Sequence, residues 1–325
     1  MKRGSLPPVL ENNYDEKLYL EEKEGLQLTA DFSDVLFIGG TGRSGTTIAG
    51  KLLSRHTEVK LSVPVEIKFL TSGNGLLDLY RDPWISRTGK FAWRRDANLH
   101  KFIKTADNKW WSRPGKKGGT TGLSVGIERE DWESLIKNLK SQIHVDRLSA
   151  CQEFVRDFID LQKGDGSYRM WIDTTPPNLM RAKELSHLLP GARFLHIIRD
   201  GRDVASSVVR ETWGPTSLFD ALEWWEGRMK QILDQTRPLD KQVKHVWMED
   251  LVENTREKSL EEILQFIGLK PEKTLLEYFE KTISAASSHT GRWRKEIIDL
   301  TKFNNKYQKI LARLYDRGLI PPNQR

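Results

Sequence analysis

Residues 39–47 (GGTGRSGTT) combine four glycines with one cation and several hydroxyl side chains. The apolar run before them, residues 35–38, predicts a buried parallel strand, and the apolar residues within 46–53 recur at helical spacing. Glycines at 39, 40, 42 and 45 allow unusual backbone dihedrals and a close approach of a ligand to the backbone. A strand, a glycine-rich turn and a helix N-terminus form a phosphate cradle, because free N–H groups and the positive end of the helix dipole face the anion.

The cation of this loop is not where a nucleoside-triphosphate loop has it. Residues 40–47 follow the outline G-x-x-x-x-G-[K]-[ST], but Thr46 occupies the lysine position and Arg43 supplies the charge from inside the loop. This arrangement favours a phosphorylated donor other than a nucleoside triphosphate. The alternative is a glycine-rich turn that binds nothing.

A second candidate anion site lies far along the chain, in residues 193–209 (RFLHIIRDGRDVASSVV). Residues 194–198 predict a buried strand that ends at Arg199, and an apolar-periodic helix begins at Asp203 and contains Ser207. An arginine holds phosphate oxygens bidentately, and a hydroxyl adds a neutral donor. Alone, this stretch is equally compatible with surface charge after a core strand.

Taken in this order, the two motifs resemble those of sulfotransferases that use 3′-phosphoadenosine 5′-phosphosulfate (PAPS). The arginine variant of the loop is similar to the bacterial and Golgi-type branch. The resemblance implies a P-loop-type three-layer α/β fold, with a central parallel sheet flanked by helices, over about residues 33–300. It implies these donor-binding residues: Gly42, Arg43, Ser44, Gly45, Thr46 and Thr47 for the 5′-phosphosulfate, Arg199 and Ser207 for the 3′-phosphate, and Gly291, Arg292 and Trp293 in a late basic loop.

Glu66 is the candidate catalytic base. It follows a Val-rich segment, residues 59–65, that predicts a strand, and in open parallel sheets ligands bind at the carboxyl ends of strands. The resemblance places a catalytic glutamate at this position; the alternative is an exposed loop carboxylate. Asp173, after the predicted strand 168–172, is a second candidate base or an orienter of one. Thr174 stands where related bacterial enzymes have a lysine, so one donor-stabilising cation is in doubt.

The least regular part of the sequence is residues 71–130, which we interpret as an acceptor-side insertion. Residues 81–117 carry eleven Lys and Arg side chains against three Asp, an excess larger than the net charge of +7 of the whole chain. They also contain Trp84, Trp93, Trp110 and Trp111. Cations among aromatic faces suit a sugar, an aromatic acceptor or an anionic partner, and single-stranded nucleic acid uses similar groups. A solvated face over a small satellite core is the alternative.

Composition limits the remaining possibilities. We expect an N-terminal arm at residues 1–32 and a single domain at 33–325. No apolar run approaches the roughly 20 residues that span a bilayer, and the N-terminus lacks a secretory signal. The single cysteine, Cys151, fits a reducing compartment and predicts a cytoplasmic protein. No metal ligand pattern is found, and the oligomeric state is open.

The predicted reaction is transfer of a sulfuryl group from PAPS, leaving the nucleotide PAP and requiring no metal. Arg43 would stabilise the charge on the leaving group and Glu66 would accept the hydroxyl proton. A P-loop kinase and a non-catalytic polyanion-binding module are the alternatives, and nucleic acid is an improbable partner. The acceptor is a small molecule or a glycan that can itself be anionic; carbohydrate is slightly favoured, while a protein tyrosine or another alcohol stays open.

Overall fold

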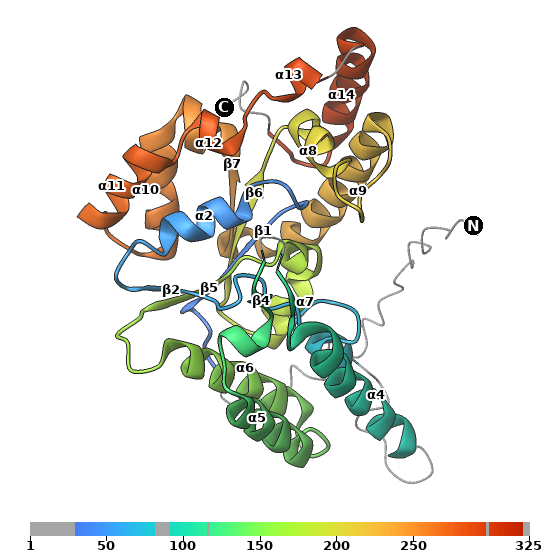
Figure 1. Ribbon diagram of the computed structural model, residues 1–325, viewed down its shortest axis with the longest axis vertical. Coiled ribbons are helices and arrows are strands. Elements are labelled where there is room, and N and C mark those ends of the chain that lie inside the picture. Colours follow the sequence, from blue (N-terminus) through green and yellow to red (C-terminus); the bar gives the residue numbers. More distant parts are fainter. Residues whose placement is uncertain (1–29, 82–91, 116–117, 297–298, 321–325) are drawn as a thin grey trace. The chain divides into compact units, whose positions relative to one another are not determined.

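The computed structural model describes residues 30–81, 92–115, 118–296 and 299–320. Its centre is a five-stranded sheet in the order β2-β5-β1-β6-β7 (Figure 1), in which every neighbouring pair is parallel. The strands are β1 (Val35–Gly39), β2 (Val59–Leu61), β5 (Met170–Asp173), β6 (Arg193–Ile198) and β7 (Val243–Trp247). Residues 113–114 and 120–121 form a separate antiparallel pair, β3 and β4. The expected central parallel sheet is confirmed.

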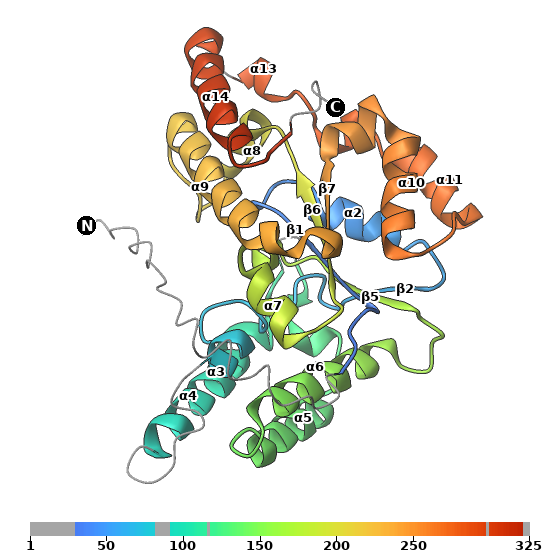
Figure 2. The same ribbon diagram turned by 180° about the vertical axis from the view of Figure 1, so that it is seen from behind.

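Helices cover both faces of the sheet, as Figures 1 and 2 show from opposite sides. The α-helices of the described residues are α2 (Thr46–Leu53), α3 (Leu76–Arg81), α4 (Ala92–Thr105), α5 (Arg129–Gln142), α6 (Arg147–Lys163), α7 (Ala182–Leu188), α8 (Gly201–Val208), α9 (Leu218–Thr236), α10 (Arg256–Ile267), α11 (Lys273–Thr282), α12 (Ala285–Ser288), α13 (Trp293–Glu296) and α14 (Leu300–Tyr315).

The alternation of side chains along β1 builds the three layers. Val35 and Phe37 point into one core with helices α3 to α7, whereas Leu36 and Ile38 point into a second core with α2, α10 and α11. All four side chains are fully buried. Successive strand residues face opposite sides of a sheet, so a continuous apolar run is what a strand with helices on both faces requires. A third core joins α8, α9 and α14 beside β6 and β7.

Two sequence expectations need correction. The strand expected over residues 59–65 is only Val59–Leu61, because the N–H of Val63 donates to Oε1 of Gln162 and Pro64 has no N–H to continue the ladder with β5. The segment 71–130 is also more regular than expected, since it contains α3, α4 and the π-helical turn Ala106–Trp110.

The tryptophans of this segment that can be described are structural. Trp110 is buried and lies beside Phe102, and Trp111 packs partly buried against Trp132 with the Arg129 guanidinium 4.8 Å above its ring. Trp84, the side chain of Trp93 and residues 1–29 of the expected N-terminal arm lie outside the described residues. Trp110 and Trp111 therefore belong to the same core as Val35 and Phe37, and not to the separate satellite core that was the alternative.

Within the described ranges, no helix combines the length and the apolar character that crossing a bilayer requires. In the same ranges, no group of three or more His, Cys, Asp or Glu side chains is arranged to hold a metal ion.

Candidate active site

The glycine-rich loop connects β1 to α2 at the carboxyl edge of the sheet. Gly42, Arg43 and Gly45 all have positive φ, at 90°, 60° and 101°. A Cβ on Gly45 would lie 1.8 Å from Cε of Met248, which follows β7. Conformation and space both require glycine there, since L side chains rarely adopt this φ. The loop is thus tightly seated on the neighbouring strand end.

The loop presents unused hydrogen-bonding groups. Thr46 and Thr47 begin α2, where the first N–H groups of a helix have no acceptor within it. Ser44 is 1% exposed, and its Oγ has no hydrogen-bond partner among the described residues. A buried hydroxyl without a partner is costly unless a ligand or water satisfies it. These groups fit the 5′-phosphosulfate end of PAPS.

Arg43 and Ser207 meet although they are 164 residues apart. Nε of Arg43 donates a hydrogen bond to Oγ of Ser207 across 2.9 Å, and its Nη1 lies 3.3 Å from Oε1 of Glu211. Because Ser207 is in α8, the cation of the first motif bridges to the serine of the second. The two expected anion sites therefore form one continuous surface.

Arg199 connects the glycine-rich loop to residues 288 and 289 through hydrogen bonds. Its Nη1 donates to the carbonyl of Arg43 at 3.2 Å, and its Nη2 donates to the carbonyls of Ser288 and His289 at 2.8 and 3.0 Å. Its Nε is buried and has no partner among the described residues. Burial lowers the pKa of the guanidinium, but an arginine keeps its charge in proteins. A buried cation with one unused donor suits an anion such as the 3′-phosphate.

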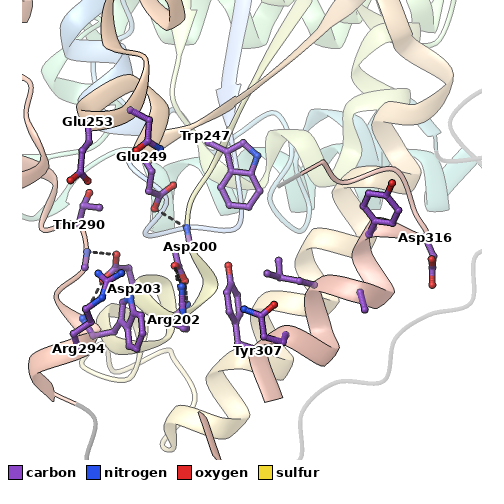
Figure 3. A pocket seen from close by; sticks show the side chains of 17 residues that line it. Asp200, Arg202, Asp203, Trp247, Glu249, Glu253, Thr290, Arg294, Tyr307 and Asp316 are labelled. Atoms are coloured by element: carbon purple, nitrogen blue, oxygen red, sulfur yellow. Dashed lines mark hydrogen bonds and ion pairs between the residues drawn. The ribbon is translucent and has the colours of Figure 1, made fainter. Parts of the chain in front are cut away.

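Residues 288–293, called here the strap, are held over α8 by Asp203. Its carboxylate accepts hydrogen bonds from the backbone N–H groups of Gly291 at 2.7 Å and Trp293 at 3.2 Å (Figure 3). The Trp293 ring also stacks under the Arg202 guanidinium, 4.0 Å from the ring centroid. This places Gly291, Arg292 and Trp293 beside the second motif.

Between the strap, α8 and the glycine-rich loop lies a cavity of about 150 Å³. It is lined by Arg43, Arg199, Asp203, Ser206, Ser207, His289 and Arg292. Three guanidinium groups and two hydroxyls against one carboxylate make it an anion site of a size suited to a phosphate group. Arg43, Arg199, Ser207 and Arg292 are thus together, as expected from the sequence.

Glu66 is positioned by the end of β5. The N–H and Oγ1 of Thr174 both donate to the carbonyl of Val65, and the N–H of Ile67 donates to Oδ1 of Asp173. The residues on both sides of Glu66 are therefore fixed, while its own side chain is 34% exposed and lies 3.8 Å from Nζ of Lys68. A fixed backbone with an accessible carboxylate is what a general base requires.

Asp173 itself is a structural anchor. It has no exposed surface, and its carboxylate accepts hydrogen bonds from Thr175, Asn178 and Ile67. Burial raises its pKa to about 7 despite these hydrogen bonds. Without access to an acceptor it cannot act as the base, so of the two roles expected for Asp173 the geometry favours that of orienter.

Thr174, where a lysine is typical, packs below α2. A Cβ on Gly50 would lie 2.4 Å from Cγ2 of Thr174, and Thr174 is fully buried. Position 174 therefore supplies no cation to the crevice. Among the described residues, the loop cation near the expected position of the sulfuryl group is therefore Arg43.

A second, larger cavity of about 740 Å³ has the opposite charge character. Asp200, Glu249 and Glu253 line it together with Trp247 and Tyr307 (Figure 3). Burial and the nearby charge of Asp200 raise the pKa of Glu249 to about 7, although the N–H of Asp200 donates to its carboxylate; its Oε2 has no partner among the described residues. Five carboxylate side chains against Arg202 and Arg294 give the lining a net negative charge, which disfavours a phosphate there.

Several neighbours of the site carry no recognisable sequence signal. Glu211, Trp213 and Trp224 surround the loop near Gly42 and Arg43, and Asp203 fixes the strap. Of these four residues, only Asp203 belongs to a motif that the sequence analysis recognised. The others follow α8 or lie within α9 at no diagnostic spacing, and their proximity to residue 42 results from the chain topology.

Comparison with known proteins adds a family and a fold. The family model described as "Sulfotransferase family" matches residues 35–273. The chain is similar to the sulfotransferase domain from the curacin biosynthetic pathway, with a TM-score of 0.51 and 15% identity over 88% of this chain and 99% of that one. No curated protein matches the sequence.

Two further solved structures are similar at lower scores. The sulfotransferase domain of the olefin synthase from Synechococcus PCC 7002 has a TM-score of 0.47 and 18% identity, over 90% of this chain and 97% of that one. Mouse sulfotransferase SULT7A1, complexed with PAP, has a TM-score of 0.43 and 10% identity, over 89% and 86%. At such identities the likeness concerns the fold alone.

Proposed function

This chain belongs to the sulfotransferase family, whose model matches residues 35–273, and we propose that it transfers a sulfuryl group from PAPS to an acceptor hydroxyl. In this proposal the backbone amides of Ser44 to Thr47 hold the 5′-phosphate end of the donor. Arg199, Ser207 and the strap residues Gly291, Arg292 and Trp293 hold its 3′-phosphate. Gly42 leaves room for the reacting group at the tip of the loop.

Arg43 stabilises the transition state. Sulfuryl transfer resembles phosphoryl transfer, an in-line displacement that depends mainly on positioning and on charge stabilisation. As the bond between the sulfur and the bridging oxygen breaks, negative charge develops on the phosphate oxygen of PAP. The permanent charge of Arg43 stabilises it, and an arginine is a poor proton donor, so PAP leaves as an anion.

Glu66 accepts the proton of the acceptor hydroxyl as its oxygen bonds to the sulfur. The products are a sulfate ester, PAP and protonated Glu66, so charge and atoms balance. Glu211 is a rival base because its carboxylate lies beside Arg43. Glu211 is 15% exposed and pairs with Arg43 at 3.3 Å, which favours a positioning role. Glu66 is 34% exposed and pairs more loosely with Lys68, at 3.8 Å, on a backbone fixed on both sides.

The observation that carries the donor assignment is the cavity of about 150 Å³ that Arg43, Arg199, Ser207 and Arg292 share. A nucleoside triphosphate has no 3′-phosphate to satisfy the buried Nε of Arg199. Calorimetric titration with PAP and with ADP, each with Mg²⁺ and with EDTA, tests the assignment. We expect PAP to bind tightly in EDTA and ADP to bind much more weakly; metal-dependent ATP binding with no preference for a 3′-phosphate would contradict it and favour a kinase.

The acceptor is proposed to be a carbohydrate. Charged side chains surround the reactive end of the loop, with Arg43 43% exposed, and such surroundings suit a polyhydroxylated acceptor better than an apolar alcohol. Transfer of labelled sulfate from PAPS to panels of sugars, lipids, phenols and peptides would identify the acceptor class.

A further inference from the structure

Two tryptophans stand at the loop that is proposed to hold the sulfuryl group. Trp213 lies in the turn between α8 and α9, and Trp224 lies in α9; their ring centroids are 6.0 Å apart and the rings are tilted by 45°. A Cβ built on Gly42 would lie 3.9 Å from Cη2 of Trp213 and 3.8 Å from Cη2 of Trp224. Both indole rings therefore reach the residue that precedes Arg43.

The pair is held in place by its surroundings. The Arg228 guanidinium stacks 4.3 Å from the Trp224 ring centroid, and it donates to the carbonyl of Thr41 in the loop. The turn carrying Trp213 is packed against the end of α8, since a Cβ on Gly214 would lie 2.2 Å from the carbonyl oxygen of Val208. Trp224 is thus linked to the loop through Arg228, and Trp213 lies beside Trp224 in a turn that packs on the end of α8.

Trp213 is nevertheless 53% exposed, an unusual state for the largest apolar side chain. In contrast to the exposed Trp213 ring, the Trp224 ring has the Arg228 guanidinium stacked on it. A large aromatic ring that is firmly positioned but open to solvent, next to a proposed reaction centre, indicates a ligand-stacking surface.

We propose that Trp213 is the acceptor platform and that it stacks against a pyranose ring of a carbohydrate acceptor. This inference rests on the proposed function. One face of a pyranose presents C–H groups, whose partial positive charge is attracted to the negative face of an indole, and the ring's rim carries hydroxyls. Arg43 and Glu211 beside the platform supply a donor and an acceptor for that rim.

The surroundings favour a sugar over a phenol. Pockets for small aromatic ligands are enclosed and mostly apolar, burying most of the ligand surface. At Trp213 the surface is open and the neighbouring groups are charged, so a phenol would gain little burial there. A sugar ring stacked on Trp213 keeps its hydroxyls in polar contact and lies next to the residue that precedes Arg43.

Binding measurements separate this platform from the donor site. Chitohexaose, cellohexaose and a desulfated heparin hexasaccharide would be titrated into the full chain, free and saturated with PAP, and compared with 2-naphthol. We expect at least one hexasaccharide to bind and Trp213→Ala to weaken it by about tenfold or more, as for truncation of a stacked tryptophan. Trp213→Phe should retain most of the affinity, and PAP affinity should be unchanged in both variants.

The matched control is Tyr315→Ala, which removes an aromatic side chain of similar exposure, 54%, from α14. It should leave saccharide binding as in the wild type. Equal saccharide affinity of wild type and Trp213→Ala, or binding of 2-naphthol without any of the saccharides, would overturn the platform. Failure of the wild type to bind PAP would overturn the donor assignment instead, and the titrations without PAP would still decide the platform.

Discussion

Arg43 donates a hydrogen bond to Ser207 across 2.9 Å, so the cation of the glycine-rich loop is bonded to a serine of the second anion site. The backbone carbonyl of Arg43 also accepts a hydrogen bond from Arg199. The side chain and the backbone of one loop residue are thus both coupled to the distant motif. We therefore expect substitutions in either motif to affect binding at the other.

Arg43→Ala should lower kcat by about 100-fold or more, because it removes the charge that stabilises the leaving group. PAP affinity should fall only modestly, since Arg199, Arg292 and the loop amides remain. Transfer of labelled sulfate gives kcat, and calorimetry gives the affinity. Lys51→Ala, on the exposed side of α2, is the control, and an Arg43→Ala enzyme with normal turnover would contradict the role.

Arg199→Ala should instead weaken donor binding, by about 10- to 100-fold for PAP, as expected for loss of charge-assisted hydrogen bonds. The affinity for AMP, which lacks a 3′-phosphate, should fall much less. Arg199 also bonds the carbonyls of Ser288 and His289, so Arg199→Lys serves as a variant that keeps the charge. If both variants lost PAP and AMP affinity equally, the 3′-phosphate assignment would be wrong.

Glu66→Gln should lower kcat/KM by about 100-fold or more with little change in PAP affinity, since it removes the proton acceptor. Glu211→Gln is the matched variant, because Glu211 is the other carboxylate near the loop. It should lower kcat/KM much less; the reverse pattern would identify Glu211 as the base.

Asp203→Asn should loosen the strap. The carboxylate accepts from Gly291 and Trp293 with its two oxygens, and an amide can replace only one acceptor. We expect faster hydrogen exchange over residues 288–293 and a PAP affinity lower by about tenfold. Asp316→Asn, near the C-terminal end of α14, provides the comparison, and unchanged exchange over the strap would show that Asp203 does not hold it.

Glu249→Gln should change how stability depends on pH. Burial raises the pKa of Glu249 to about 7 in the folded protein, from an ordinary value of 4.5. Between these values the folded state binds more protons than the unfolded chain, so Glu249 lowers the free energy of unfolding as pH rises, by on the order of 2 kcal/mol. Glu249→Gln should lose this contribution to the decrease in the free energy of unfolding with rising pH.

Urea unfolding at pH 5 and pH 8 measures the effect. The stability of Glu249→Gln relative to the wild type should be higher at pH 8 than at pH 5. Glu253→Gln, an exposed neighbour, should keep the wild-type slope. Asp173 titrates near the same pH, so part of the slope should remain in Glu249→Gln. Parallel wild-type and variant curves would mean that Glu249 ionises normally.

The sequence was informative where local chemistry determines structure. Val35 to Ile38 predicted a strand because a buried parallel strand needs apolar residues on both faces, and Gly268 predicted the end of α10, where its φ is 75°. Arg199 and Ser207 could be paired because both lie on one strand–helix unit.

Features that depend on distant packing were not accessible from the sequence. The strand predicted over residues 59–65 ends at residue 61, because hydrogen bonds with Asp173 and Thr174 hold the residues around Glu66 as a loop. Trp110 and Trp111 looked like binding residues because the sequence shows their type and not their burial. Trp213 and Trp224 approach Gly42 only because α8 and α9 return across the carboxyl edge of the sheet.

The close approach of Gly50 to Thr174 limits which side chains positions 50 and 174 can hold at the same time. A methyl group added at residue 50 has no room while threonine occupies 174, and a lysine at 174 would carry its charge into a space closed off by α2. The two positions are expected to covary among close homologues. Because the buried threonine at 174 carries no charge, replacing Arg43 with an uncharged residue would leave the glycine-rich loop with no cation of its own.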